Sequence, residues 1–112
     1  MDKTVGIVGL GIMGSAIARN LVDRGWRVVG FDIDEAKRAE LAAAHVVIAA
    51  DVTQVTRDAP IVMTSLPTAA AVEETANVIA DSGQAPRIVI ELSTLAIADP
   101  MSSQPMTIIR CR

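Results

Sequence analysis

The sequence predicts an α/β fold with a doubly wound parallel sheet. Short runs rich in β-branched residues alternate with alanine-rich stretches of helical length, which is the pattern of strands joined by helical crossovers. The strand candidates are almost continuously apolar, as expected for strands that helices cover on both faces. The chain has 112 residues, enough for one domain, and its 51% hydrophobic and 21% charged residues favour a folded chain.

The first strand and helix have the clearest pattern. Residues 4–10 (TVGIVGL) form the first expected strand. In the helix expected at residues 12–24, apolar side chains recur at every fourth position, as at Ile17 and Leu21, and make one apolar stripe. Gly25 then ends this helix as a C-cap.

The next two strand–helix units are shorter. Residues 27–32 (RVVGFD) predict the second strand, and residues 35–44 predict a helix with Asp34 as its N-cap. The third strand, residues 46–50, has a weaker pattern, and residues 51–58 are typical of a short helix.

The last regular elements are a strand, a helix and a strand. Residues 61–66 (IVMTSL) predict the fourth strand, which Pro67 ends. Residues 69–81 predict a helix that Ser82 and Gly83 end, and residues 87–92 (RIVIEL) predict the fifth strand.

The alternation stops near residue 98, so we expect a doubly wound domain over residues 1–98, truncated after its fifth strand, and an atypical tail over residues 99–112. In the usual order 3-2-1-4-5-6 the fifth strand would then lie at an edge, where residues 106–110 (MTIIR) could pair with it. The short, proline-containing connection disfavours a parallel crossover. We therefore expect an antiparallel return, or an exchange that forms a homodimer through the strand-five edge; a disordered tail is the alternative.

One motif in this sequence indicates a chemistry. Gly9, Gly11 and Gly14 fit the pattern G-x-G-x-x-G, and they follow a predicted strand and open a predicted helix. Gly9 permits a tight turn, Gly11 leaves room for a pyrophosphate, and Gly14 allows close packing of the helix. The free N–H groups and the dipole of the helix N-terminus attract a diphosphate. The motif predicts a dinucleotide site.

An acidic residue stands where such a site binds ribose. Asp32 ends the second strand, 18 residues after Gly14, and can accept hydrogen bonds from the adenosine ribose. Its charge would repel a 2′-phosphate, and it is followed by Ile33 rather than by an arginine. The sequence thus favours NAD over NADP, with NADP as the alternative. In the structural alternative, the glycines only make a tight turn and Asp32 is a solvated strand end.

Three segments resemble the β-hydroxyacid dehydrogenase family, which includes 6-phosphogluconate dehydrogenase, 3-hydroxyisobutyrate dehydrogenase and tartronate semialdehyde reductase. They are GIVGLGIMGSAIARNL at residues 6–21, SLPTAAAVEE at 65–74 and ELST at 91–94. The resemblance implies a Rossmann-type NAD(P)-binding domain. It also implies hydride transfer between nicotinamide and a small 3-hydroxy acid or its aldehyde.

The resemblance also implies further cofactor contacts. Met13, Leu66 and Pro67 would lie against the cofactor, and Ser93 and Thr94 would lie near the nicotinamide. All of them fall beyond the carboxyl ends of predicted strands, where ligands bind on open parallel sheets. The expected cofactor-binding residues are Gly9, Gly11, Ile12, Met13, Gly14, Asp32, Leu66, Pro67, Ser93 and Thr94.

The chain departs from the family at the catalytic lysine, which the family carries on a later helix in a K-x-x-x-N motif. Neither Lys3 nor Lys37 is followed by Asn four residues later. We therefore expect no catalytic residue here: the chain would bind the dinucleotide without turning over a substrate alone. The alternatives are a non-catalytic dinucleotide-binding module, the product of a frameshifted or truncated gene, or an interaction module with a vestigial glycine loop. The sequence does not reveal the substrate.

Composition argues against other partners. The net charge is −3, the ten basic residues are scattered, and the chain has one Phe, one Trp and no Tyr, so no nucleic-acid partner is expected. No apolar run approaches the roughly 20 residues of a membrane span, and the first residues do not resemble a signal peptide. We expect a cytoplasmic protein without a membrane partner.

Metal binding and histidine catalysis are also disfavoured. The single cysteine, Cys111, excludes an internal disulfide and a multi-cysteine zinc site. Asp32, Asp34 and Glu35 form an acidic cluster, but a ribose contact and a helix cap explain these residues more simply than a metal. The only histidine, His45, is expected in a surface turn.

Overall fold

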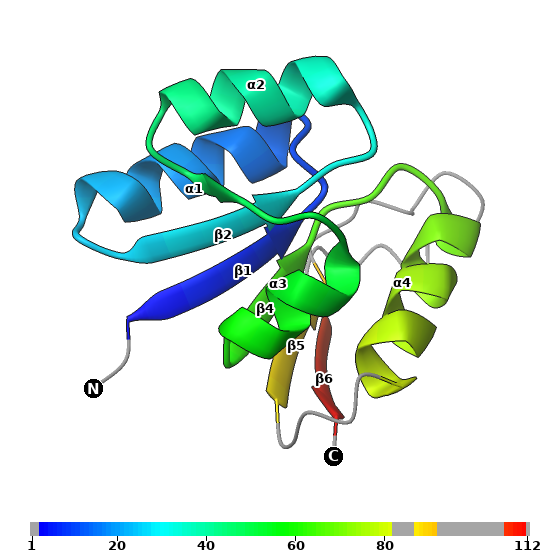
Figure 1. Cartoon of the computed structure of the whole chain (residues 1–112). Helices are drawn as coiled ribbons and strands as arrows, with labels where there is room; N and C mark the ends of the chain where they lie inside the picture. Colours follow the sequence, from blue (N-terminus) through cyan, green and yellow to red (C-terminus); the bar gives the residue numbers. More distant parts are fainter. Residues whose placement is uncertain (1–2, 82–86, 92–106, 112) are drawn as a thin grey trace.

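The computed structural model describes residues 3–81, 87–91 and 107–111 (Figure 1). In chain order its elements are β1 (Thr4–Val8), α1 (Ile12–Asp23), β2 (Arg27–Phe31), α2 (Glu35–Ala43), β3 (Val47–Ile48), α3 (Val52–Asp58), β4 (Ile61–Thr64), α4 (Ala69–Asp81), β5 (Arg87–Glu91) and β6 (Thr107–Cys111). The five expected strands and four expected helices up to residue 91 are all present.

These strands form one sheet in the order β3-β2-β1-β4-β5-β6. Strands β1 to β5 are parallel, which confirms the predicted doubly wound architecture. The chain moves outward from β1 to β3, then returns to β4 on the other side of β1. The order therefore reverses between β1 and β4, which is the point at which open α/β sheets bind ligands.

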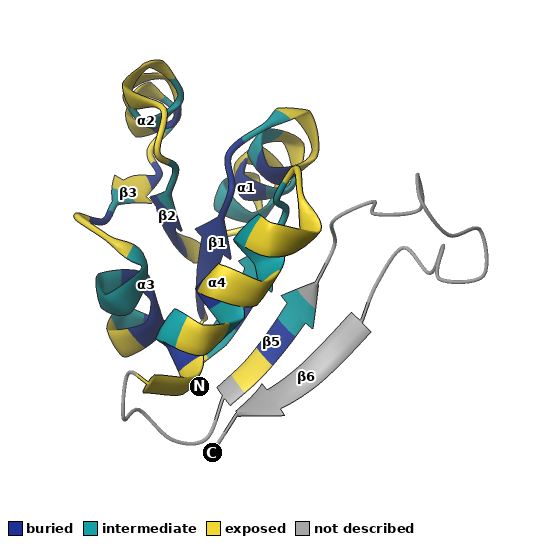
Figure 2. Cartoon of the chain, turned by 90° about the vertical axis from the view of Figure 1, so that its right-hand side faces the viewer, coloured by how far each residue is buried: buried dark blue, intermediate teal, exposed yellow. Residues whose placement is uncertain are grey.

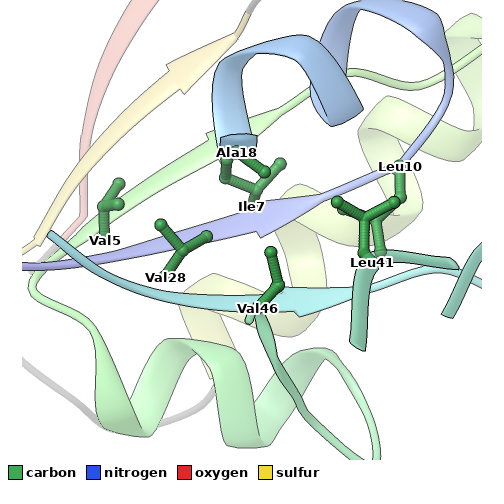
Figure 3. Packing of buried hydrophobic residues seen from close by; sticks show 7 residues of the cluster. All are labelled: Val5, Ile7, Leu10, Ala18, Val28, Leu41 and Val46. Atoms are coloured by element: carbon green, nitrogen blue, oxygen red, sulfur yellow. The ribbon is translucent and has the colours of Figure 1, made fainter. Parts of the chain in front are cut away.

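Helices cover both faces of this sheet (Figure 1). The first cluster of buried side chains joins β1 and β2 to α1 and α2 (Figure 3); its members are Val5, Ile7, Leu10, Ala18, Val28, Leu41 and Val46. The second joins the other face of the sheet to α3 and α4; its members are Val8, Val29, Ala49, Val55, Val62, Ile79 and Val89. All five residues of β1 are buried (Figure 2), as the continuous apolar pattern predicts.

Several predicted helix ends are confirmed. Asp34 caps α2, because its side chain accepts a hydrogen bond from the N–H of Ala36 at 2.9 Å. Helix α1 ends at Asp23 with Arg24 as its C-cap, one residue before the predicted cap; Gly25 follows with φ +87°, a conformation that glycine adopts readily. His45 is exposed in the turn after α2, as expected. The predicted end of α4 at Ser82 and Gly83 lies outside the described residues.

The strands are shorter than predicted at their carboxyl ends. β1 ends at Val8 rather than at residue 10, because Gly9 turns the chain with φ +97°. β4 ends at Thr64, two residues before the predicted end at residue 66. The predicted strands thus included the first residues of the loops that follow them.

The third strand, predicted over residues 46–50, contains only Val47 and Ile48. The N–H of Val46 donates to the carbonyl of Leu41 in α2 at 3.1 Å, so it is not available for pairing with β2. The N–H of Ala50 donates to the side chain of Gln54 at 2.8 Å and leads into α3. Hydrogen bonds to the flanking helices therefore limit the length of β3.

The sixth strand returns antiparallel to β5 within the same chain. Residues 107–111 pair with residues 87–91, with Val89 opposite Ile109. The strand lies one residue beyond the predicted range of 106–110. Of the two arrangements expected from the sequence, an antiparallel return or an exchange between chains, the described chain has the return.

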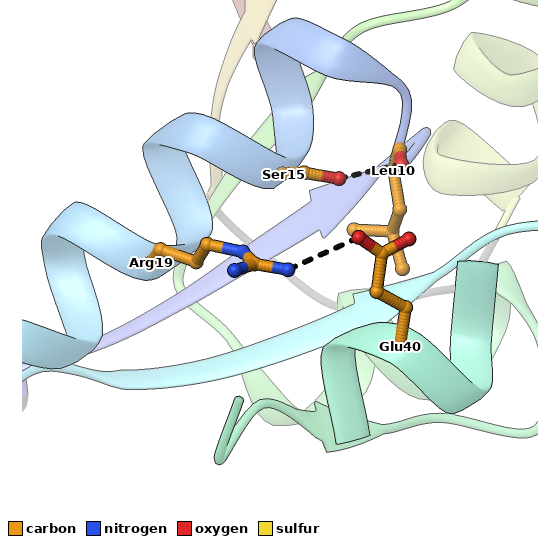
Figure 4. Close-up of polar contacts among 4 residues, drawn as sticks. All are labelled: Leu10, Ser15, Arg19 and Glu40. Carbon is orange, nitrogen blue, oxygen red and sulfur yellow. Dashed lines mark hydrogen bonds and ion pairs between the residues drawn. The ribbon is translucent and has the colours of Figure 1, made fainter. Parts of the chain in front are cut away.

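An ion pair joins α1 and α2, the two helices that pack on the first cluster. Arg19 of α1 lies 3.1 Å from Glu40 of α2 (Figure 4), and these side chains are 50% and 60% exposed. An exposed pair of this kind contributes about 1 kcal/mol at most, so the buried clusters dominate the packing of α1 and α2.

None of the helices in the described part of the chain has the length and apolar character that a membrane span requires.

Candidate cofactor site

A cavity of about 730 Å³ lies at the carboxyl ends of β1, β2 and β4. Its walls come from these strand ends and the loops that follow them, from the first turns of α1, α2 and α3, and from one side of α4. The lining residues are Val8, Gly9, Gly11, Met13, Phe31, Asp32, Ile33, Asp34, Lys37, Val52, Ser65, Leu66, Pro67, Ala71, Glu74, Thr75 and Val78. Cofactor sites in proteins have volumes of roughly 300–1,000 Å³, so the cavity has the size of a ligand site.

Two of the three motif glycines are required by close contacts. A Cβ atom on Gly9 would lie 2.0 Å from the carbonyl oxygen of Ser65, and Gly9 has φ +97°. A Cβ atom on Gly14 would lie 2.0 Å from the carbonyl oxygen of Gly9. The loop after β1 therefore packs against β4 on one side and against α1 on the other, as the motif predicts.

Gly11 differs from the other two glycines. Apart from its chain neighbours, no atom of the described residues lies within 4 Å of a Cβ placed on Gly11, so this part of the structure leaves the space open. Gly11 lines the cavity and is the N-cap of α1, with no side-chain hydrogen bond at this cap and no acidic residue in the first turn. The positive end of the α1 dipole therefore faces open space, an arrangement that suits a diphosphate.

The carboxylate of Asp32 is held on both oxygens. Oδ2 accepts a hydrogen bond from the N–H of Leu10 at 2.7 Å, and Oδ1 accepts one from the N–H of Asp34 at 2.8 Å. The backbone thus holds Asp32 in place, and its role as a ribose acceptor stays a prediction. A carboxylate offers about four lone pairs, so two are left for the hydroxyl groups of a ribose.

Arg38, on α2, also holds the chain at the end of β2. The guanidinium of Arg38 donates from Nη1 to the backbone carbonyl of Asp32 at 2.8 Å. The same guanidinium lies 5.9 Å from the centre of the Phe31 ring, within the range of a cation–π contact. Arg38 thus fixes the backbone that carries the predicted ribose-binding residue.

The structure brings together most of the predicted site residues that it describes. Six line the cavity: Gly9, Gly11, Met13, Asp32, Leu66 and Pro67. Gly14 is buried behind the loop, and the side chain of Ile12 is 94% exposed and outside the cavity lining. Ser93 and Thr94 lie outside the described residues.

Sequence reasoning missed part of the lining. On α4, Ala71, Thr75 and Val78 face the cavity, and their spacing of four and three is a helical period that the sequence shows. Ser65 also lines the cavity, directly after β4. Among the lining residues that the structure describes, Lys37 is the only cationic one, and the same lining contains the carboxylates of Asp32, Asp34 and Glu74. No pattern in the sequence indicates that Lys37, on α2, would line this cavity.

The fold and the glycine loop together define a dinucleotide-binding domain of the Rossmann type. Residues 4–104 match the family described as the NAD binding domain of 6-phosphogluconate dehydrogenase. The chain belongs to this family. The resemblance seen in the sequence is thereby confirmed.

Known relatives agree with this assignment. Over 95 residues, the chain is 33% identical to 3-hydroxyisobutyrate dehydrogenase, mitochondrial, from Drosophila melanogaster; the match covers 84% of the chain and 29% of that protein. It is 37% identical over 79 residues to 2-(hydroxymethyl)glutarate dehydrogenase from Eubacterium barkeri, which covers 69% of the chain and 26% of that protein. The chain thus spans less than a third of the length of these relatives.

Solved structures show the same fold. The structure of Mycobacterium tuberculosis 3-hydroxyisobutyrate dehydrogenase with L-serine matches with a TM-score of 0.81 and 28% identity, over 92% of this chain and 35% of that one. An imine reductase variant from Myxococcus stipitatus in complex with NAD⁺ matches with a TM-score of 0.77 over 84% of this chain and 33% of that one. Its identity is 17%, so this second likeness concerns the fold alone.

Proposed function

We propose that this chain is the cofactor-binding part of an oxidoreductase similar to 3-hydroxyisobutyrate dehydrogenase, and that it prefers NAD(H). The observation that carries the proposal is the open space over Gly11, between the N-terminus of α1 and the carboxylate of Asp32. When bound, the nicotinamide cofactor supplies the hydride chemistry, and the protein binds and orients it.

In this proposal each wall of the cavity binds one part of the dinucleotide. The first turn of α1 binds the diphosphate, and Asp32 accepts hydrogen bonds from the adenosine ribose. Met13, Leu66 and Pro67 supply apolar contacts. From the family resemblance, we place Ser93 and Thr94 near the nicotinamide.

We propose further that the chain does not transfer hydride alone. Lys3 precedes β1, at the end of the sheet away from the cavity, and Lys37 lines the cavity on α2 beside Asp34. Neither fits the family's K-x-x-x-N motif. An assay of the pure chain with NAD⁺ and small 3-hydroxy acids should give no turnover; steady NADH production would contradict this part of the proposal. A non-catalytic binding module, the second candidate, would also give none.

The chain should bind NADH in preference to NADPH, with Kd values that differ roughly tenfold or more. Asp32 repels a 2′-phosphate, and the side chain that follows it, Ile33, is 90% exposed and uncharged. Both Kd values can be measured by titration of the cofactor fluorescence. We expect micromolar or weaker binding by this chain, because it spans less than a third of the length of these relatives and the cavity that it forms leaves part of a dinucleotide exposed.

Two variants test whether Asp32 causes this preference. Asp32→Ala should narrow the difference between the two cofactors, because it removes the charge beside the 2′-position. Glu74→Ala is the matched control, since Glu74 lines the same cavity from α4, and it should leave the ratio unchanged. Equal or tighter binding of NADPH by the unchanged chain would reject the NAD assignment.

We also propose that two copies can form a dimer by exchanging their tails. In such a dimer, β6 of one chain would pair with β5 of the other in the antiparallel register seen within one chain. Light scattering should then show a dimer for the whole chain and a monomer for a chain that ends at Ala98. A monomer in the first case, or an unchanged dimer in the second, would disprove exchange through the tail.

A further inference from the structure

We propose that Asp32 shapes the diphosphate subsite as well as the ribose subsite, because its carboxylate holds the glycine loop. This inference rests on the proposed dinucleotide binding and adds a positioning role for Asp32. It starts from a contact between residues 22 positions apart: the 2.7 Å hydrogen bond from the N–H of Leu10 to Asp32 Oδ2.

The carboxylate continues the pairing of two strands beyond their ends. Strands β1 and β2 pair up to Val8 and Phe31. The N–H of Gly9 then donates to the carbonyl of Phe31 at 2.9 Å. The next N–H, that of Leu10, does not continue the hydrogen bonding between β1 and β2. It donates to the side chain of Asp32 instead of to a backbone carbonyl.

Leu10 is fixed on all sides. Its side chain is 1% exposed and packs in the first cluster, and its carbonyl accepts a 2.7 Å hydrogen bond from Ser15 Oγ (Figure 4). Its N–H is bound to a charged acceptor, which makes a stronger hydrogen bond than a neutral one. Because these contacts fix the peptide groups on both sides of Leu10, they also fix the direction in which the chain enters Gly11 and the first turn of α1.

The two roles of Asp32 are compatible. Each carboxylate oxygen accepts one backbone N–H and keeps a lone pair for a ribose hydroxyl group. Loss of the carboxylate would therefore act on two parts of the ligand. It would remove a ribose contact directly, and it would release the loop that presents N–H groups to the diphosphate.

A ligand without ribose hydroxyl groups separates the two roles. The probe 2′,3′-dideoxy-ADP keeps the diphosphate but cannot donate from the ribose to Asp32. If Asp32 only binds ribose, Asp32→Asn should bind this anionic probe as tightly as the wild type or more tightly, because a negative charge has been removed. If Asp32 holds the loop, we expect Asp32→Asn to bind it about three- to tenfold more weakly, because an asparagine has one acceptor oxygen for two N–H groups.

Asp34→Asn is the matched control. It removes one negative charge from the same turn, and an asparagine can still cap α2. It should bind 2′,3′-dideoxy-ADP as tightly as the wild type or more tightly. Equal losses in the two variants, or no loss in Asp32→Asn, would overturn the proposal.

Amide hydrogen exchange tests the loop without any ligand. In the wild-type chain the Leu10 amide should exchange at least tenfold more slowly than the Gly11 amide, and Asp32→Asn should remove much of this protection. Equal exchange at the two amides in the wild type would overturn the proposal even if the variant does not fold. A protected Leu10 amide in a chain that binds neither ADP nor the dideoxy probe would instead reject the dinucleotide function, and the diphosphate role of Asp32 with it.

Discussion

Gly9→Ala should lower the free energy of unfolding by about 3 kcal/mol or more. The alanine would have to adopt φ +97°, and its Cβ would lie 2.0 Å from the carbonyl oxygen of Ser65. The loop at Gly9 and the backbone of Ser65 cannot move apart easily, because the N–H of Ser65 is bound to the carbonyl of Val8 at 2.9 Å. Urea denaturation followed by circular dichroism measures the loss.

Two other glycines separate the causes of this loss. Gly25 has φ +87°, but in the described part of the chain a Cβ there would meet no atom within 4 Å beyond its chain neighbours. Gly25→Ala therefore isolates the effect of the backbone conformation, about 1–2 kcal/mol. Gly11 has φ −71° and an equally open surrounding, so Gly11→Ala should change the stability by about 1 kcal/mol at most. If Gly9→Ala were no more harmful than Gly25→Ala, the contact with Ser65 would not limit this position.

Gly11→Val should weaken dinucleotide binding by about a hundredfold or more, while the chain stays folded; a hundredfold loss corresponds to about 2.8 kcal/mol. Among the described residues, only chain neighbours of Gly11 come within 4 Å of a Cβ at this position, so we expect the valine to fit the fold. The same space is where the diphosphate must approach the backbone. Titration with NADH measures the affinity, and thermal unfolding measures the stability.

The control for this substitution is Ala16→Val, which places the same side chain on an exposed position of α1 outside the cavity lining. It should leave the affinity for NADH unchanged. Gly11→Ala should fall between the wild type and Gly11→Val. Full affinity in Gly11→Val would mean that the glycine loop serves the fold and not the ligand.

The fold was predictable because periodicity reports which side chains are buried. Helix α4 begins at Ala69, as predicted, and is helical through Asp81, the last residue described before the gap. Periodicity does not report the hydrogen-bond partner of each N–H group. For that reason the predicted first strand ran through Leu10, whose N–H leaves the ladder for a side chain, and the third strand was predicted too long.

The site was predictable where one residue type is needed for a local reason. Gly9 and Gly14 occupy positions of this kind, and the spacing of the motif identifies them. Asp32 was identified by its spacing after these glycines. The contribution of Lys37 depends on how α2 lies against the end of β2, which is a tertiary property. The hydrogen bond between Leu10 and Asp32 has the same origin, because it joins loops that follow two different strands.

The packing of Trp26 makes this fold a convenient subject for studies of cooperativity. It is the only tryptophan of the chain and packs against the first cluster, on the α1 and α2 face of the sheet. Its emission therefore reports the melting of that face, whereas circular dichroism averages over all helices, including α3 and α4 on the other side. Coincident transitions in the two signals would show that the shared strands make the two halves unfold as a single two-state unit.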